Sequence, residues 1–177
     1  MRPPVSADDA LRNALIDGIV GEVHHVHQAG YLRATIILVY CGIDALAYLS
    51  MPQDHERVRQ EDFVAWVDRY LVFRDGLRVP GIEVYAARCA VVHTYTAEAD
   101  LHRAGRVQRK IGYIDEALPE IQAAAGVQNL VLVSVRGLVD AFCGGVQTFL
   151  RELVQDGLRR RTVARRLEAM VQELPLR

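Results

Sequence analysis

The stretch YLRATIILVYCGIDALAYL, residues 31–49, decides the fold. It is apolar on nearly every side of a helix, so this helix should lie at the centre of the domain or of a dimer. Asp44 is the exception, and we expect an arginine or a hydroxyl beside it because an unpaired buried charge is very costly. Its longest apolar run, Ala34 to Leu49, is interrupted by Asp44 and falls short of the roughly 20 residues that cross a bilayer. We therefore interpret it as a core helix and not as a membrane span.

Amphipathic patterns lie on both sides of this central stretch. Apolar residues recur every three or four positions between Leu11 and Val26, which predicts a helix that ends near Gly30. Further helices are predicted around residues 63–71, over residues 80–95, from residue 134 to about residue 157, and from about residue 162 onward. Gly144 and Gly145 lower the helix propensity of the helix predicted from residue 134, so we expect another backbone to pack closely there.

The segment after residue 95 changes character. Residues 96–108 are polar and are predicted to form a loop. RKIGYI (109–114) and NLVLVSV (129–135) are short apolar runs bounded by polar or turn residues, which indicates two strands. The predicted fold class is mainly α: a single-domain helical bundle of about five to six helices over residues 1–177, with a small β-hairpin between residues 109 and 135.

Composition indicates a globular protein but does not predict a binding partner. Of 177 residues, 51% are apolar and 24% charged, and the net charge is −1. The basic residues are almost all arginine, with Lys110 the single lysine. Arginine suits phosphate recognition, but a nearly neutral chain can attract nucleic acid only through a local patch.

Cysteine usage and the N-terminus predict a cytoplasmic location. Cys41, Cys89 and Cys143 are widely spaced and each lies in an apolar segment, as buried free thiols usually do. The chain begins MRPPVSADDALRN, with no apolar run behind its basic residue, so no signal peptide is expected. We expect no membrane association.

The segment GIEVYAARCAVVHTY, residues 81–95, contains the most specific pattern. Arg88 is followed after four residues by His93, on a predicted helix that directly follows a Pro-Gly start. Here the chain resembles the HEPN superfamily, small helical bundles whose signature is Arg, four to six residues, then His. The resemblance covers about fifteen residues and the helical layout. Cys89 stands where the family often has a polar residue, which puts catalysis in doubt more than fold.

The resemblance implies metal-independent cleavage of RNA, with no cofactor. A ribose 2′-hydroxyl would attack the neighbouring phosphate, His93 would move a proton, and Arg88 would hold the phosphate. Family sites are commonly completed across a homodimer interface. RNA and an antitoxin or nucleotidyltransferase-like protein are the further partners that the resemblance implies.

Helix geometry leaves a second interpretation open. Five residues turn a helix by about 500°, which places Arg88 and His93 about 140° apart. His93 instead aligns with Ile82, Ala86 and Cys89 on the apolar side. On this hypothesis the protein is a non-catalytic interaction module of the same fold, with a buried histidine and a surface arginine.

Other clusters could bind RNA or a metal. Two basic groups are candidate phosphate contacts. The first, after the motif, is Arg103, Arg106, Arg109 and Lys110, which could instead be an exposed loop. The second is the run LRRRTVARRLEAM (158–170), in which we select Arg160 and Arg161 and which could instead be a solvated helix face. His24 and His27 share a helix face next to His25, but no nearby residues complete a zinc site. No metal is therefore predicted, and a metal- or small-molecule-binding bundle is the least favoured hypothesis.

Overall fold

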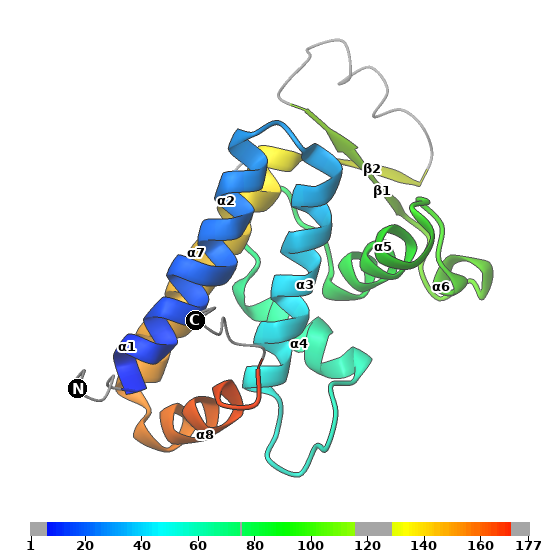
Figure 1. Ribbon diagram of the computed structural model, residues 1–177. Coiled ribbons are helices and arrows are strands. Elements are labelled where there is room, and N and C mark those ends of the chain that lie inside the picture. Colours follow the sequence, from blue (N-terminus) through cyan, green and yellow to red (C-terminus); the bar gives the residue numbers. More distant parts are fainter. Residues whose placement is uncertain (1–6, 75, 116–128, 171–177) are drawn as a thin grey trace.

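The computed structural model describes residues 7–74, 76–115 and 129–170. Helix accounts for 68% of this part of the chain, in seven helices that accompany a two-stranded sheet (Figure 1). The predicted mainly α bundle is confirmed. Its helices are α1 to α8, of which α1, α2 and the π-helical segment η1 between them form one continuous helix.

The first helix ends where the sequence predicts. Its parts are α1 (Ala7–Arg12), η1 (Asn13–Val20) and α2 (Gly21–Gln28). Gly30 follows with φ 79°, a conformation that glycine adopts without strain. The Tyr31 N–H donates to the Val26 carbonyl at 3.2 Å, which closes the helix end.

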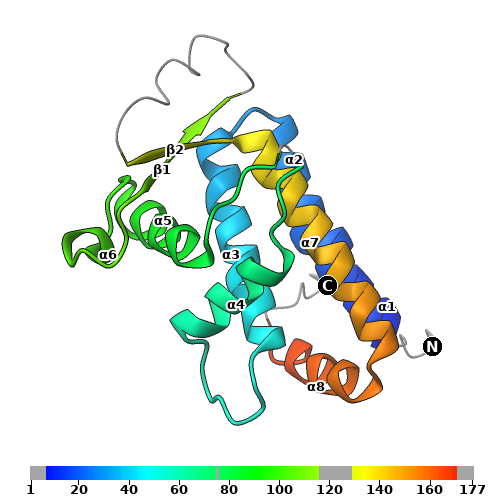
Figure 2. The same ribbon diagram turned by 180° about the vertical axis from the view of Figure 1, so that it is seen from behind.

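Helix α3 (Leu32–Ser50) lies at the centre of the bundle. It contacts α2, α4 (Gln60–Tyr70), α5 (Gly81–Thr94), α7 (Val135–Gln155) and α8 (Gly157–Leu167). In both ribbon views α7 runs beside the first helix, while α4 and α5 lie across α3 from this pair (Figures 1 and 2). By length and composition α3 could cross a membrane, but 50% of its most apolar window is buried inside the protein.

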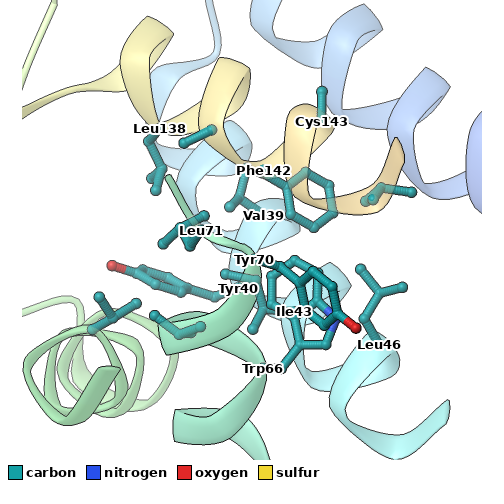
Figure 3. Packing of buried hydrophobic residues seen from close by; sticks show 14 of the residues in the cluster. Val39, Tyr40, Ile43, Leu46, Trp66, Tyr70, Leu71, Leu138, Phe142 and Cys143 are labelled. Atoms are coloured by element: carbon teal, nitrogen blue, oxygen red, sulfur yellow. The ribbon is translucent and has the colours of Figure 1, made fainter. Parts of the chain in front are cut away.

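The hydrophobic core is built on this central helix. Trp66, Tyr70 and Phe142 are buried between α4 and α7, and Val39, Ile43 and Leu46 of α3 face them (Figure 3). The Trp66 and Phe142 ring centroids lie 6.3 Å apart. Aromatic rings of this size supply most of the apolar area that a small core buries.

The sequence predicted a loop over residues 96–108, but part of this segment is helical. Residues Asp100–Arg103 form the short helix α6. Its start is fixed by His102, whose Nδ1 accepts a hydrogen bond from the Ala99 backbone N–H at 3.0 Å. The prediction missed this turn because histidine is not a usual capping residue.

The two strands are confirmed but the hairpin is wrong. Strand β1 (Lys110–Ile114) pairs with β2 (Leu130–Ser134) in parallel, so that Ile111 lies opposite Val131. A hairpin turn joins only antiparallel strands, and parallel strands need a connection of about a dozen residues or more. The stretch between the strands, residues 115–129, meets that length.

The last two helices also differ from the sequence prediction. Asp156, and not Gly157 or Thr162, marks the boundary between α7 and α8. Its carboxylate accepts hydrogen bonds from the Leu158 and Arg159 backbone N–H groups at 3.1 and 3.0 Å. This N-cap begins α8 earlier than expected.

Two neighbouring glycines give a matched test of packing. A Cβ on Gly145 would lie 2.8 Å from the Tyr70 carbonyl oxygen and 3.1 Å from Trp66 Cη2, whereas a Cβ on Gly144 would meet nothing within 4 Å. The expected close backbone approach is thus confirmed at Gly145 and wrong at Gly144. We expect Gly145→Ala to lower the free energy of unfolding by about 1–3 kcal/mol and Gly144→Ala to raise it by about 0.5–1 kcal/mol. Urea unfolding of both variants checks this, and equal effects would contradict it.

A pair of tyrosines, one buried and one half-buried, joins the sheet to α3. The hydroxyl groups of Tyr40 and Tyr113 are hydrogen-bonded to each other. Burial raises the pKa of both, and for Tyr40 the neighbouring Tyr113 raises it further. The folded protein therefore keeps these protons above pH 10, where an unfolded chain would release them (tyrosine pKa about 10).

This tyrosine pair should make the protein sensitive to alkali. Its stabilising contribution is fully present below about pH 10 and is lost as the pH rises toward the folded-state pKa values. We expect the free energy of unfolding to fall between about pH 9.5 and 11 in the wild type, and to fall less steeply in the double variant Tyr40→Phe, Tyr113→Phe. Urea titrations across that range measure both slopes. Identical slopes would show that other groups cause the loss.

Candidate functional site

Arg88 and His93 meet near the end of α5. Arg88 lies in the third turn of this helix, and His93 is its second-last residue. Arg88 Nη1 lies 3.1 Å from His93 Nε2. His93 is exposed and Arg88 is half-buried. The two side chains are therefore close enough to reach one phosphate group, and that phosphate could approach from solvent.

The contact between them defines the hydrogen-bonding state of the imidazole. A guanidinium has only donors, so Nη1 must donate and His93 Nε2 must accept. An imidazole that accepts at Nε2 carries its ring proton on Nδ1. Nε2 thus presents its lone pair toward the guanidinium. A lone pair on this nitrogen is what a general base needs to take a proton.

Asp44 anchors the arginine from α3. Its Oδ2 accepts from Arg88 Nε at 2.8 Å and lies 2.7 Å from Arg88 Nη2. This contact confirms the arginine that the sequence predicted beside Asp44. Burial raises the pKa of the Asp44 carboxyl, and the Arg88 guanidinium opposes that rise. The pair holds the guanidinium in place while Nη1 stays directed at His93.

The helical-wheel prediction of a buried His93 is wrong. The backbone positions diverge as expected, but an arginine side chain is long enough to cross the helix surface. His93 also lies in the last turn of α5, where Thr94 is exposed as well. Ala86, which the wheel placed on the same side, is buried, whereas His93 is exposed.

A shallow pocket of about 190 Å³ opens beside His93. It lies between α5 and the α6 region, with Tyr85, Cys89 and Leu101 among its apolar lining. Thr94 and Glu98 supply polar groups at its edge. The pocket is open to solvent and adjoins the imidazole, so it can receive a group attached to the phosphate. No sequence pattern indicated this pocket, because α6 was not predicted.

The predicted phosphate contacts after the motif are mostly ion-paired. Arg109 binds Glu83 through two hydrogen bonds, Nε to Oε1 at 2.8 Å and Nη2 to Oε2 at 2.7 Å. Lys110 Nζ lies 2.5 Å from Glu98 Oε2. Arg103 pairs with Asp100, and Arg106 is exposed. The pairs of Arg103 and Lys110 are exposed, and such pairs are worth only about 0–1 kcal/mol, so a phosphate can replace the carboxylate partner there. The two hydrogen bonds of Arg109 to the mostly buried Glu83 carboxylate make that residue a poorer candidate.

The basic helix α8 separates into exposed and buried arginines. Arg161 and Arg165 are exposed, and Arg160 is half-buried. Arg159 Nη1 lies 3.1 Å from Glu152 Oε2, and Arg166 is buried with 8% of its surface exposed. Arg160 and Arg161 are on α8, which packs against α1, α3 and α7. The structure does not bring them into the group formed by Arg88 and His93.

The histidines of the first helix do not gather further metal ligands. His24 and His25 are exposed and His27 is half-buried. His24 Nε2 lies 3.4 Å from Sγ of Cys143, which is on α7. Within residues 7–74, 76–115 and 129–170, no three His, Cys, Asp or Glu side chains are grouped closely enough to hold a metal ion.

The cysteines are free thiols of differing exposure. Cys143 is buried and Cys89 half-buried, whereas Cys41 is exposed, so the expectation that all three are buried is wrong for Cys41. Burial raises the pKa of the Cys143 thiol to about 11. This thiol is therefore protonated at neutral pH and unsuited to act as a nucleophile.

Comparison of the chain with protein-family models, curated proteins and solved structures finds no match.

Proposed function

We propose that this protein is a HEPN-like RNA-binding protein that cleaves phosphodiesters without a metal ion, through Arg88 and His93. The observation that carries the proposal is the 3.1 Å contact between Arg88 Nη1 and His93 Nε2 at an exposed helix end. A phosphate oxygen that enters between them can accept from the guanidinium while its ribose 2′-hydroxyl reaches the imidazole.

The proposed reaction is a transesterification. The 2′-oxygen forms a bond to phosphorus as the bond to the 5′-oxygen breaks, and the 2′-hydroxyl proton passes to His93 Nε2. The guanidinium donates to the phosphate oxygens, whose negative charge grows in the transition state. The departing 5′-oxygen takes a proton from the imidazolium of a second copy of the site. The products are a 2′,3′-cyclic phosphate and a free 5′-hydroxyl.

Asp44 supports this role of the arginine. Because the carboxylate holds one side of the guanidinium at 2.7–2.8 Å, the side that faces His93 is fixed before a phosphate binds. Three of the five N–H donors of an arginine are engaged in the contacts with Asp44 and His93, and further N–H groups can meet a phosphate. Such preorganisation lowers the cost of aligning the reacting groups.

The imidazolium of the second copy of the site can take part only in a homodimer. The exposed end of α5 gives two copies room to approach along this surface. We expect gel filtration to show a dimer over a wide concentration range. A strict monomer that still cleaves RNA would remove the need for a second imidazole.

The test of the proposed activity is cleavage of a structured RNA in excess chelator. We expect the wild-type protein to cut this RNA and to leave a DNA of the same sequence intact, because DNA lacks the attacking 2′-hydroxyl. Cleavage of RNA and DNA alike, or a requirement for added metal, would contradict the proposal.

A non-catalytic interaction module of the same fold is the second candidate. It is favoured by one observation, that Asp44 binds Arg88 as an ordinary structural ion pair would. On that hypothesis the protein cuts no RNA, and Arg88→Ala lowers the melting temperature without any other loss.

A further inference from the structure

Tyr95 follows the helix that carries Arg88 and His93, and its backbone is unusual. It is the C-cap of α5, with φ 54° and ψ 27°, in the left-handed region. A bulky side chain is uncommon in this region, where helix ends usually have glycine or asparagine. Its backbone N–H donates to the Val91 carbonyl at 3.2 Å, which holds it there.

Packing does not explain why a tyrosine occupies this position. The Tyr95 side chain is 69% exposed, and Tyr31 at 67% is the other strongly exposed tyrosine. The remaining tyrosines are buried or half-buried. Glycine at residue 95 would relieve the backbone and expose no aromatic ring to water. An exposed aromatic side chain on a residue with a strained backbone indicates a role outside the fold.

Hydroxyl groups on each side fix the segment that presents the ring. Thr94 Oγ1 donates to the Ala90 carbonyl at 2.8 Å and lies 2.8 Å from Thr96 Oγ1. Thr96 Oγ1 in turn donates to the Glu98 carbonyl at 3.1 Å. The chain at Tyr95 is therefore ordered by contacts of its neighbours, while its own ring is left open to solvent.

We propose that Tyr95 stacks on an unpaired nucleobase next to the phosphate held by Arg88 and His93. Two residues span at most about 7 Å of chain, so the ring is within reach of a nucleotide whose phosphate lies at His93. Every nucleobase offers a flat face to an aromatic ring, and RNA is usually recognised through such splayed bases. This inference rests on the proposed function and names its substrate class as single-stranded RNA.

Binding measured without cleavage tests the stacking directly. In a His93→Ala parent, we expect Tyr95→Gly to raise the dissociation constant for a labelled single-stranded oligoribonucleotide about 5- to 100-fold, with an unchanged or higher melting temperature. Tyr95→Trp should keep the affinity, and its added fluorescence should be quenched on binding. Tyr31→Ala is the matched control and should change nothing. Duplex RNA should bind the parent more weakly than single strands, and Tyr95→Gly should remove that difference.

Each outcome separates this inference from the proposed activity. Unchanged affinity in Tyr95→Gly, or unquenched fluorescence in Tyr95→Trp at saturation, overturns the stacking even if the wild type cleaves RNA. Stacking by a wild-type protein that cuts no RNA overturns the catalytic proposal and keeps this one. A parent that binds no RNA overturns the stacking, while cleavage by the wild type in chelator decides the catalytic proposal by itself.

Discussion

His93→Ala should reduce RNA cleavage in excess chelator by about 10²–10⁴-fold, the usual range for loss of a positioned general base. The folded protein should be unaffected because the imidazole is exposed and its side-chain contact is with Arg88. Single-turnover cleavage of a defined RNA measures the loss, and the melting temperature checks the fold. Equal cleavage by wild type and variant would assign the activity to another group.

Arg88 variants need a control because this residue also neutralises Asp44. Arg88→Ala should lower cleavage by about 10²–10³-fold and should also destabilise the fold, since it leaves a half-buried carboxylate unpaired. Arg88→Lys keeps a positive charge without the planar fork. We expect it to recover most of the stability and little of the activity. Arg57→Ala, which changes an exposed arginine outside the candidate phosphate contacts, should leave both unchanged.

Arg166→Ala should lower the free energy of unfolding by about 3 kcal/mol or more. Its Nη1 donates to the Met51 carbonyl at 2.5 Å and its Nη2 to the Pro52 carbonyl at 2.8 Å, and two further contacts reach the Tyr48 and Leu49 carbonyls at 3.3 Å. These carbonyls lie at the end of α3 and in the two residues that follow it, and the last carbonyls of a helix have no partners within the helix. Hydrogen bonds from a charged donor contribute about 1.5–3 kcal/mol each.

The neighbouring residue supplies the control for this prediction. Arg165 is exposed on the same helix, so Arg165→Ala should change the stability by no more than about 0.5 kcal/mol. Urea unfolding monitored by circular dichroism compares the two variants. A small effect of Arg166→Ala would show that water replaces the guanidinium at the end of α3.

Much of the fold could be predicted from periodicity. The apolar stretch at residues 31–49 is indeed the central helix, and Gly30 ends the helix before it. The direction of strand pairing could not be predicted, because alternation within a strand is the same in parallel and antiparallel sheets. Asp156 was missed as a helix start because Gly157 offered a more familiar helix end.

The candidate site could be predicted only in part. The Arg-His spacing selected the two residues as candidates, but an ideal helix placed them on different faces. The long arginine side chain that closes the gap is seen in the structure. Sequence suggested that Asp44 needs a partner without showing that it is Arg88. The basic run on α8 could not be divided into exposed Arg165 and buried Arg166, because both choices fit the same pattern of charges.

The measurement that bears most directly on the function is product analysis with a substrate altered at one atom. In chelator, wild-type protein should cut a short RNA at a defined linkage and leave a 2′,3′-cyclic phosphate. Replacing the one ribose before that linkage by deoxyribose should stop cleavage there. A 5′-phosphate product, or continued cleavage at the deoxyribose, would contradict a reaction in which the 2′-oxygen attacks a phosphate held between Arg88 and His93.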